Sequence, residues 1–215
     1  MTIMNERDPF RRRYIAGAEL VGSEGYPKIA PTQSLPQNVI SFNESGNGND
    51  ISSNWVDHFI ADSLFERVYN NCDRYISRYS HALGVIGTDF SAHRNMPKWQ
   101  RSNNIGRNRS IDYYLQQHEI DVIPTVSWAY IEDFEWCLDG LPAEASLAIS
   151  TNGCANNFLS RNIFIDGVRE VQRRLRPSHL IICGNNVPKE LLEFENIVSY
   201  ANFSQRMHRR IKNGK

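Results

Sequence analysis

The sequence predicts an α/β fold with a mostly parallel sheet of about six strands that alternate with helices. Short apolar segments recur along the chain, and between them apolar residues are spaced as on one face of a helix. The chain has 215 residues, of which 40% are hydrophobic and 22% charged, as is ordinary for a single globular domain. Two architectures fit this pattern, a partial TIM-barrel-like arrangement and a doubly wound sheet.

In the first part of the chain, residues 1–37 are predicted to be an irregular segment, because glycine and proline punctuate them too often for long elements. A short strand is predicted at 39–42, followed by a polar loop rich in Gly, Asn and Ser. A helix is then predicted from residue 55 to 79, with one apolar face formed by Val56, Ile60, Leu64 and Val68.

Strands and helices alternate in the rest of the chain. Strands are predicted at 83–88, 122–126, 146–150, 180–183 and 197–202. Helices are predicted at 110–117, 132–138, 164–175 and 188–196. Residues 204–215 are predicted to be a basic, frayed C-terminal tail of a single domain that spans 1–215.

Polar residues directly follow several predicted strands, at the edge where ligands bind in both architectures. Asp89 is the candidate catalytic acid or base, because a carboxyl group at the end of a buried strand is partly desolvated and its pKa is raised. Trp128 can stack on a base or a sugar ring. The candidate ligand-binding residues at these strand ends are Ser91, Ser127, Trp128, Ser150, Asn152 and Asn185. A structural role is the alternative, since polar residues also cap loops where strands stop.

The segment 90–111 has no acidic residue and is predicted to be a basic loop beside Asp89. Arginine offers a bidentate fork to phosphate and carboxylate groups, so Arg101, Arg107 and Arg109 are further ligand-binding candidates. A solvated surface balanced by acids elsewhere is the other interpretation of this segment.

Overall charge and missing motifs limit the possible functions. Lys+Arg and Asp+Glu both number 24, so no net charge attracts nucleic acid or membrane. The sequence has no phosphate-binding loop, no dinucleotide fingerprint and no G-x-S-x-G elbow. Scattered histidines and the lack of a C-x-x-C pair predict no metal site, and no cofactor is expected. No apolar run of about 18 residues and no signal segment are present, so we expect a cytoplasmic protein without membrane contact.

A set of segments between Gly84 and Gly184 resembles a known family. They are GVIGTDFS, NMPKWQ, RNRSIDYYLQ, IDVIPTVSWA, FEWCLDGLP, SLAISTNG, FIDGV and LRPSHLIICG. Together they resemble domain-of-unknown-function family 4417, which is encoded largely by phages, plasmids and integrated elements. The resemblance implies a cytoplasmic mobile-element protein with an α/β fold, and it brings no reaction with it.

Two functions fit these observations. In the first, a phage or mobile-element accessory protein binds an anionic ligand (a nucleotide or nucleic acid) or a host defence protein in a strand-end cleft, in counter-defence or replication. In the second, a hydrolase or transferase acts on a nucleotide or sugar, with Asp89 as acid or base and Glu132 or Asp133 as a second carboxylate. An enzyme requires Asp89 to face a concave pocket with another acid across it. A binding protein requires a broad exposed basic face, with Asp89 held by backbone amides.

Overall fold

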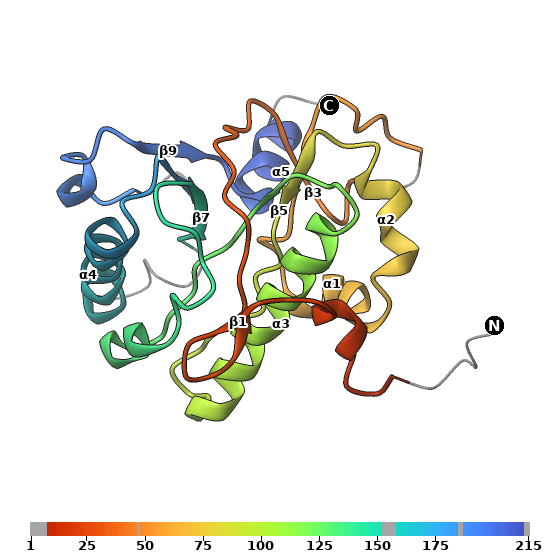
Figure 1. Cartoon of the computed structure of the whole chain (residues 1–215). Coiled ribbons are helices and arrows are strands. Elements are labelled where there is room, and N and C mark those ends of the chain that lie inside the picture. The colour runs from red at the N-terminus through yellow and green to blue at the C-terminus, as the bar shows by residue number, and fades with distance from the viewer. Residues whose placement is uncertain (1–7, 47, 152–157, 185–186, 213–215) are drawn as a thin grey trace.

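The computed structural model describes residues 8–46, 48–151, 158–184 and 187–212. Residues 8–37 contain a 3-10 helix, η1 (Arg12–Ile15), and a short antiparallel pair formed by β1 (Leu20–Val21) and β2 (Tyr26–Pro27). Both η1 and β2 pack against α3 (Lys98–Gln116), so this segment, predicted to be irregular, covers the outside of a helix (Figure 1).

Seven parallel strands form two small sheets in chain order. The four-stranded sheet contains β3 (Val39–Ser41), β4 (Trp55–Asp57), β5 (Gly84–Ile86) and β6 (Val122–Ile123). The three-stranded sheet contains β7 (Ser146–Ser150), β8 (His179–Cys183) and β9 (Ile197–Tyr200). These bounds confirm the predicted α/β class with parallel strands. Among the described strands β9 does not pair with β3, so no closed barrel forms, and the strands do not make one continuous doubly wound sheet.

A helix or short helical turn follows each strand from β4 onward. They are α1 (Asp62–Asn70) and α2 (Asp73–Tyr79) after β4, α3 after β5, η2 (Ile131–Glu135) after β6, α4 (Phe158–Leu175) after β7, η3 (Lys189–Leu191) after β8 and α5 (Phe203–Lys212) after β9. In Figure 1, α4 lies beside the three-stranded sheet, and α1, α2 and α3 lie on the side of the four-stranded sheet.

Three sequence predictions need correction. Residues 55–57 are a strand rather than the start of a helix, and Trp55, Val56 and Asp57 are all buried between β3 and β5. Most of the predicted basic loop at 90–111 belongs to α3, which begins at Lys98. The residues predicted to be a frayed tail are helical from 203 to 212, as α5.

A narrow seam joins the two sheets. Thr125, just after β6, and Ala148 of β7 form a parallel bridge. The Val126 amide donates to the Ala148 carbonyl at 2.8 Å, and the Ala148 amide donates to the Pro124 carbonyl at 3.0 Å. Arg109 of α3 supports the seam, because its buried guanidinium donates to the carbonyl oxygens of Thr125, Cys137 and Asp139.

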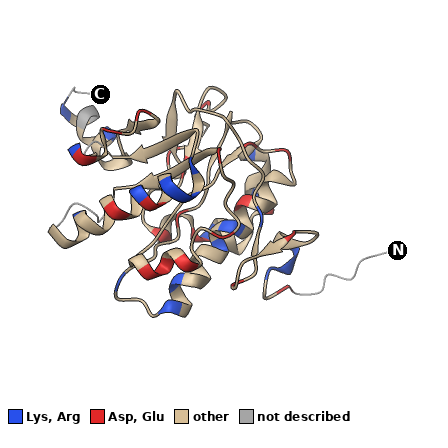
Figure 2. Ribbon diagram, turned by 60° about the vertical axis from the view of Figure 1, so that its left-hand side comes forward, with Lys and Arg blue, Asp and Glu red and all other residues tan. Residues whose placement is uncertain are grey.

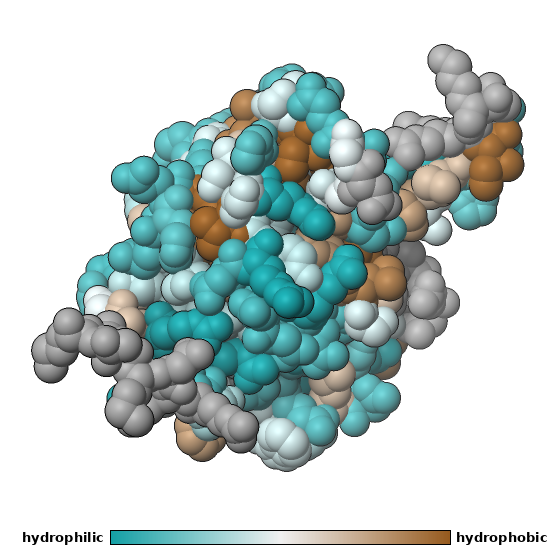
Figure 3. Space-filling view, turned by 90° about the vertical axis from the view of Figure 1, so that its right-hand side faces the viewer, coloured by the Kyte–Doolittle hydropathy of each residue, from teal (hydrophilic) through white to brown (hydrophobic). Residues whose placement is uncertain are grey.

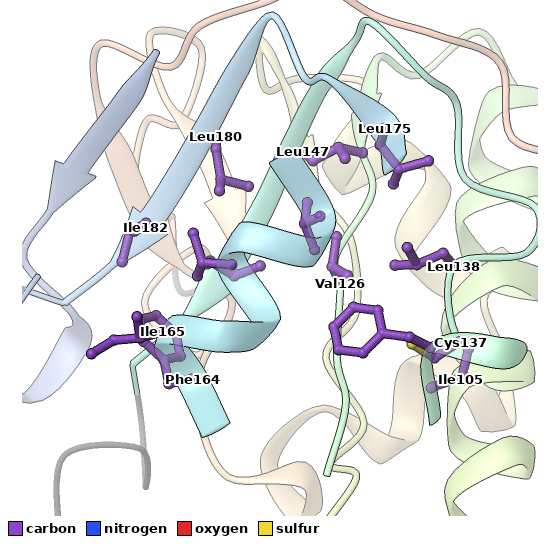
Figure 4. Close-up of a cluster of buried hydrophobic side chains, with 14 of the residues drawn as sticks. Ile105, Val126, Cys137, Leu138, Leu147, Phe164, Ile165, Leu175, Leu180 and Ile182 are labelled. Carbon is purple, nitrogen blue, oxygen red and sulfur yellow. The ribbon is translucent and has the colours of Figure 1, made fainter. Parts of the chain in front are cut away.

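Buried apolar side chains form a core on each sheet. Phe164, Ile165 and Leu175 of α4 pack against Leu147 and other apolar residues of β7 and β8, as Figure 4 shows. A second cluster lies under α1, α2 and α3. Burial of this apolar area is the main force that holds the helices on the strands.

One face of the molecule is mostly polar. Figure 3 shows a mostly hydrophilic face on which hydrophobic residues appear as separate patches. No helix among the described residues is both long enough and apolar enough to cross a membrane.

Candidate functional site

A pocket of about 970 Å³ lies at the carboxyl ends of five of the parallel strands, where the sequence predicts a cleft. The segments that follow β4, β5 and β6 form much of its wall, together with the end of β7, the first part of α4 and residues 202–204 after β9. Five of the predicted site residues line this pocket: Asp89, Ser91, Ser127, Trp128 and Ser150. Segments far apart in the sequence thus deliver the predicted side chains to one place.

Asp89 is half-buried in the pocket wall, three residues after the end of β5. The Ser127 hydroxyl, from the segment after β6, donates a hydrogen bond to Asp89 Oδ1 at 2.6 Å. Burial raises the pKa of Asp89 to about 7; the Ser127 hydrogen bond opposes this increase, and nearby Asp62 adds a smaller one. The carboxyl group therefore exists in both protonation states near neutral pH.

A second carboxyl group, Asp62, lines the same pocket from the first turn of α1. The Ser91 hydroxyl and amide donate to its two oxygens at 2.9 and 3.1 Å. Ser91 in turn is held by the Asn104 side chain, which donates to the Ser91 carbonyl at 2.7 Å. Asp62 was not among the predicted site residues, because the helical spacing of 55–79 obscured the strand end that precedes it.

Trp128 forms part of the pocket wall, and other aromatic side chains occupy its surroundings. Its ring lies 5.4 Å from that of Phe134 and stacks on Phe164 at 6.1 Å between centroids. The indole Nε1 donates to the Ile163 carbonyl at 3.3 Å, and the ring packs directly on Gly167 of α4. Trp128 therefore anchors the segment after β6 to α4.

The three predicted anion-binding arginines do not line the pocket. Arg101 is buried and forms a bidentate pair with Asp133, with Nε and Nη2 at 3.1 and 2.7 Å from its oxygens. Arg107 packs over the Phe90 ring at 3.5 Å. Arg109 is buried among carbonyl groups at the seam. Each guanidinium is engaged by the protein itself, in the interior or against α1.

The remaining predicted residues fall elsewhere. Asn152 and Asn185 lie outside the described residues. Glu132 is exposed on η2 and is not part of the pocket lining, and Asp133 is held by Arg101 and by the amides of Ala129 and Tyr130. Asp62 instead supplies the second carboxyl group of the pocket.

Asp112 is a further buried acid that was not among the predicted site residues. Asp112 of α3 is fully buried, and its carboxyl group lies against Gly87 and close to the Thr88 amide. Burial raises the pKa of Asp112 to about 8, and the positive charge of Arg109 opposes the increase. Three helical positions separate Arg109 from Asp112, so the two groups share one face of α3.

At the end of the pocket that includes α4, the segment after β5 supplies His93 and Arg94. The Arg94 Nη2 donates to the Ser160 hydroxyl of α4 at 2.9 Å. Within the described parts of the chain, no three His, Cys, Asp or Glu side chains lie close enough to hold a metal ion.

Comparisons with known proteins identify relatives of the chain. Residues 18–201 match the model of the DUF4417 family, a domain of unknown function. Over 160 residues the chain is 30% identical to the Gene 1 protein of Mycobacterium phage L5, a match that covers 74% of this chain and 70% of the phage protein. The Gene 1 protein of Mycobacterium phage D29 is also 30% identical over 160 residues, which are 59% of its length. No solved structure matches the chain.

Proposed function

The chain belongs to the DUF4417 family and is homologous to phage-encoded proteins, and from its pocket we propose that it is an enzyme acting on a small polar molecule. In this proposal Asp89 is the general acid or base. One observation carries it: a carboxyl group with a pKa of about 7 stands in the wall of a pocket of about 970 Å³. A group that is half protonated near neutral pH can both accept and donate a proton in a reaction.

The partners of Asp89 support catalysis over a purely structural role. Its described hydrogen-bond partner is the Ser127 hydroxyl, and no backbone amide of the described residues caps it. Asp62 provides another acid in the same pocket. Hydrolysis or group transfer on a nucleotide or sugar can use such a pair of groups, one to move a proton and one to orient the ligand or the attacking water.

The distribution of charge favours a small ligand over a nucleic-acid surface. Figure 2 shows Lys and Arg interspersed with Asp and Glu along the helices rather than gathered in one broad field. The arginines of α3 that would have formed such a field, Arg101, Arg107 and Arg109, are engaged within the protein. Binding of nucleic acid through a basic face that neutralises several phosphates is therefore less well supported than binding of a small ligand.

The scaffold we infer for this function is an incompletely closed, barrel-like arrangement of the seven strands. Support comes from one buried cluster that draws side chains from strands of both sheets: Trp55, Ile86, Ile123, Ala148, Ile181 and Cys183. A shared interior keeps the strand ends of both sheets around one pocket, as catalysis at a common rim requires.

The test combines ligand binding with turnover. Nucleotides, nucleosides, sugars and sugar phosphates are screened for an increase in melting temperature, because a ligand that binds the native state stabilises it. Each compound that binds is then incubated with the wild type, Asp89→Asn and a surface control, Asp166→Asn, and its products are measured. We expect turnover by the wild type and the control and a loss of about 100-fold or more in Asp89→Asn.

Two results count against the proposal. Turnover by Asp89→Asn at the wild-type rate removes Asp89 as the acid or base. Binding of a compound by the wild type without any conversion makes the pocket a binding site, the other function that the sequence allows.

A further inference from the structure

The geometry points to an anionic small molecule as the ligand, with Arg94 as the residue that binds its phosphate or carboxylate group. This inference rests on the proposed small-molecule pocket and specifies the class of its ligand. Arg94, which lines the pocket, takes the anion-binding role that the sequence predicted for Arg101, Arg107 and Arg109.

Arg94 is held in place by its neighbours. The Tyr130 hydroxyl donates to the Arg94 backbone carbonyl at 2.8 Å, which ties the segment after β5 to the segment after β6. The Arg94 Nη2 donates to the Ser160 hydroxyl at 2.9 Å, so the guanidinium is directed toward the first turn of α4. A side chain that is positioned before the ligand arrives loses little conformational entropy on binding.

The charge of Arg94 is not balanced by a described neighbour. Arg101 pairs with Asp133 at 2.7 Å and Arg107 with Glu66 at 3.5 Å, whereas no acidic side chain in the described parts of the chain lies within ion-pair distance of Arg94. The two acids of the pocket, Asp62 and Asp89, receive hydrogen bonds from Ser91 and Ser127. The guanidinium therefore retains donors for an incoming oxyanion.

The chemistry of the group that fits here follows from these donors. A guanidinium presents its N–H groups in a planar fork that matches two oxygens of a phosphate or carboxylate. His93 lines the pocket next to Arg94. The ligand thus has an oxyanion near Arg94 and a proton-exchanging group near Asp89, as in a phosphorylated nucleoside or sugar.

The experiment measures the melting temperature in potassium phosphate and in potassium acetate against potassium chloride at matched ionic strength. The proteins are the wild type, Arg94→Gln, Arg94→Lys and Arg161→Gln. Arg161 is the matched control, because it follows Ser160 on α4, pairs with Glu190 on the surface and does not line the pocket. Phosphate and acetate are used separately to distinguish a site for a phosphate group from a site for a carboxylate group.

We expect one of the two anions to raise the melting temperature of the wild type and of Arg161→Gln and to leave Arg94→Gln unchanged. Loss of a charge-assisted hydrogen bond weakens binding by about 10- to 100-fold. Arg94→Lys is expected to bind the anion with an affinity between those of the wild type and Arg94→Gln, because it keeps the charge and loses the planar guanidinium. A folded Arg94→Gln is recognised by its unchanged melting temperature in chloride.

An equal shift in the wild type and Arg94→Gln overturns the inference, since the stabilisation then does not depend on Arg94. No shift of the wild type in either anion overturns it too. Neither result touches the role of Asp89, which is tested through turnover by Asp89→Asn. Asp89→Asn is expected to keep the shift, which distinguishes a failure of the anion site from a failure of the proposed enzyme.

Discussion

The Ser127 hydroxyl donates to Asp89 Oδ1 across 2.6 Å, and this bond joins the segments that follow two neighbouring parallel strands. The hydroxyl stabilises the ionised carboxylate, so it holds the pKa of Asp89 below the value that burial alone would give. The two side chains therefore act as one unit in which Ser127 sets the proton affinity of Asp89.

Removing this hydroxyl should raise the pKa of Asp89 further. In Ser127→Ala the carboxylate loses a donor while its burial is unchanged, so its titration midpoint moves above the wild-type value of about 7. The measurement is the ¹³C chemical shift of the Asp89 carboxyl carbon as a function of pH. Ser63→Ala, another hydroxyl of the pocket wall, is the control and should leave the midpoint in place. An unchanged or lower midpoint in Ser127→Ala contradicts the assigned role.

The raised pKa of Asp89 also predicts how stability depends on pH. An unfolded aspartate titrates near 3.8 and native Asp89 near 7, so between these values the native state binds more protons than the unfolded state. The contribution of Asp89 to the free energy of unfolding therefore falls as pH rises from about 4 to 7 and then levels off. Asp89→Asn lacks this contribution, so its stability relative to the wild type should increase between pH 4 and pH 8.

Urea unfolding of both proteins across this pH range checks the prediction. Asp166→Asn, an exposed acid of α4, serves as the control and should follow the wild-type curve. A wild-type stability that rises between pH 4 and 7 relative to Asp89→Asn would show that the native carboxyl group is ionised more easily than in the unfolded chain.

Gly167 of α4 allows Trp128 to pack on the helix. A Cβ atom at position 167 would overlap the Trp128 indole ring, so Gly167→Ala forces the tryptophan or the helix to move. Overpacking of this kind costs about 1–3 kcal/mol, more than the roughly 1 kcal/mol by which alanine favours a helix over glycine. Thermal unfolding should show Gly167→Ala to be less stable than the wild type.

Two further variants test the cause of this loss. Gly106→Ala of α3 is the matched helix control, because its added Cβ would stand 3.3 Å from Tyr26 Cε1, a contact that a small shift relieves. Combining Gly167→Ala with Trp128→Leu should recover part of the loss, since the double variant removes the overlapping ring. Additive losses in the double variant would mean that the two residues do not interact.

Arg206 fastens α5 to the ends of β3 and β4. Its Nη2 donates to the Ser41 hydroxyl at 2.6 Å and to Asp57 at 3.3 Å, and Glu44 lies 3.6 Å away. Asp57 is fully buried, so Arg206→Gln leaves a carboxyl group without its cation and raises the pKa of Asp57 further. We expect a loss of about 2–4 kcal/mol that is larger at pH 8 than at pH 5, because ionised Asp57 is the costly form.

Chemical denaturation at both pH values gives the size of this effect. Adding Asp57→Asn to Arg206→Gln should restore part of the stability, because the unpaired charge is then gone. An effect of Arg206→Gln that is equal at pH 5 and pH 8 would mean that Asp57 does not carry the charge that Arg206 balances.

Strand ends were predictable because their signal is local. A short apolar run followed by polar residues marks where a buried strand leaves the sheet, and parallel pairing then brings such ends together without further information. Asp89, Ser127 and Ser150, which were chosen by this rule, line one pocket. The geometry of that pocket was therefore implied by the order of the elements along the chain.

Two other features required tertiary information. In the segment 55–68 the apolar residues fit one helical stripe, although Val56 belongs to a strand and Leu64 and Val68 belong to α1. A single helical period therefore ran across two different elements. The arginines of α3 were predicted to bind an anion, because the segment 90–111 around them has no acidic residue. Their partners, such as Asp133 for Arg101 and the Thr125 carbonyl for Arg109, come from distant segments. Partners of this kind cannot be identified by periodicity.

The bridge between Thr125 and Ala148 gives the two sheets a shared seam of very few backbone bonds, directly below the pocket. Ser127 and Ser150 stand on either side of it. A ligand that contacts both Ser127 and Ser150 would hold the two sheets together at the seam. It would therefore slow the exchange of the Val126 and Ala148 amide protons with solvent. A ligand in the pocket would thus reduce the motion of the two sheets relative to each other, including at residues that the ligand does not contact.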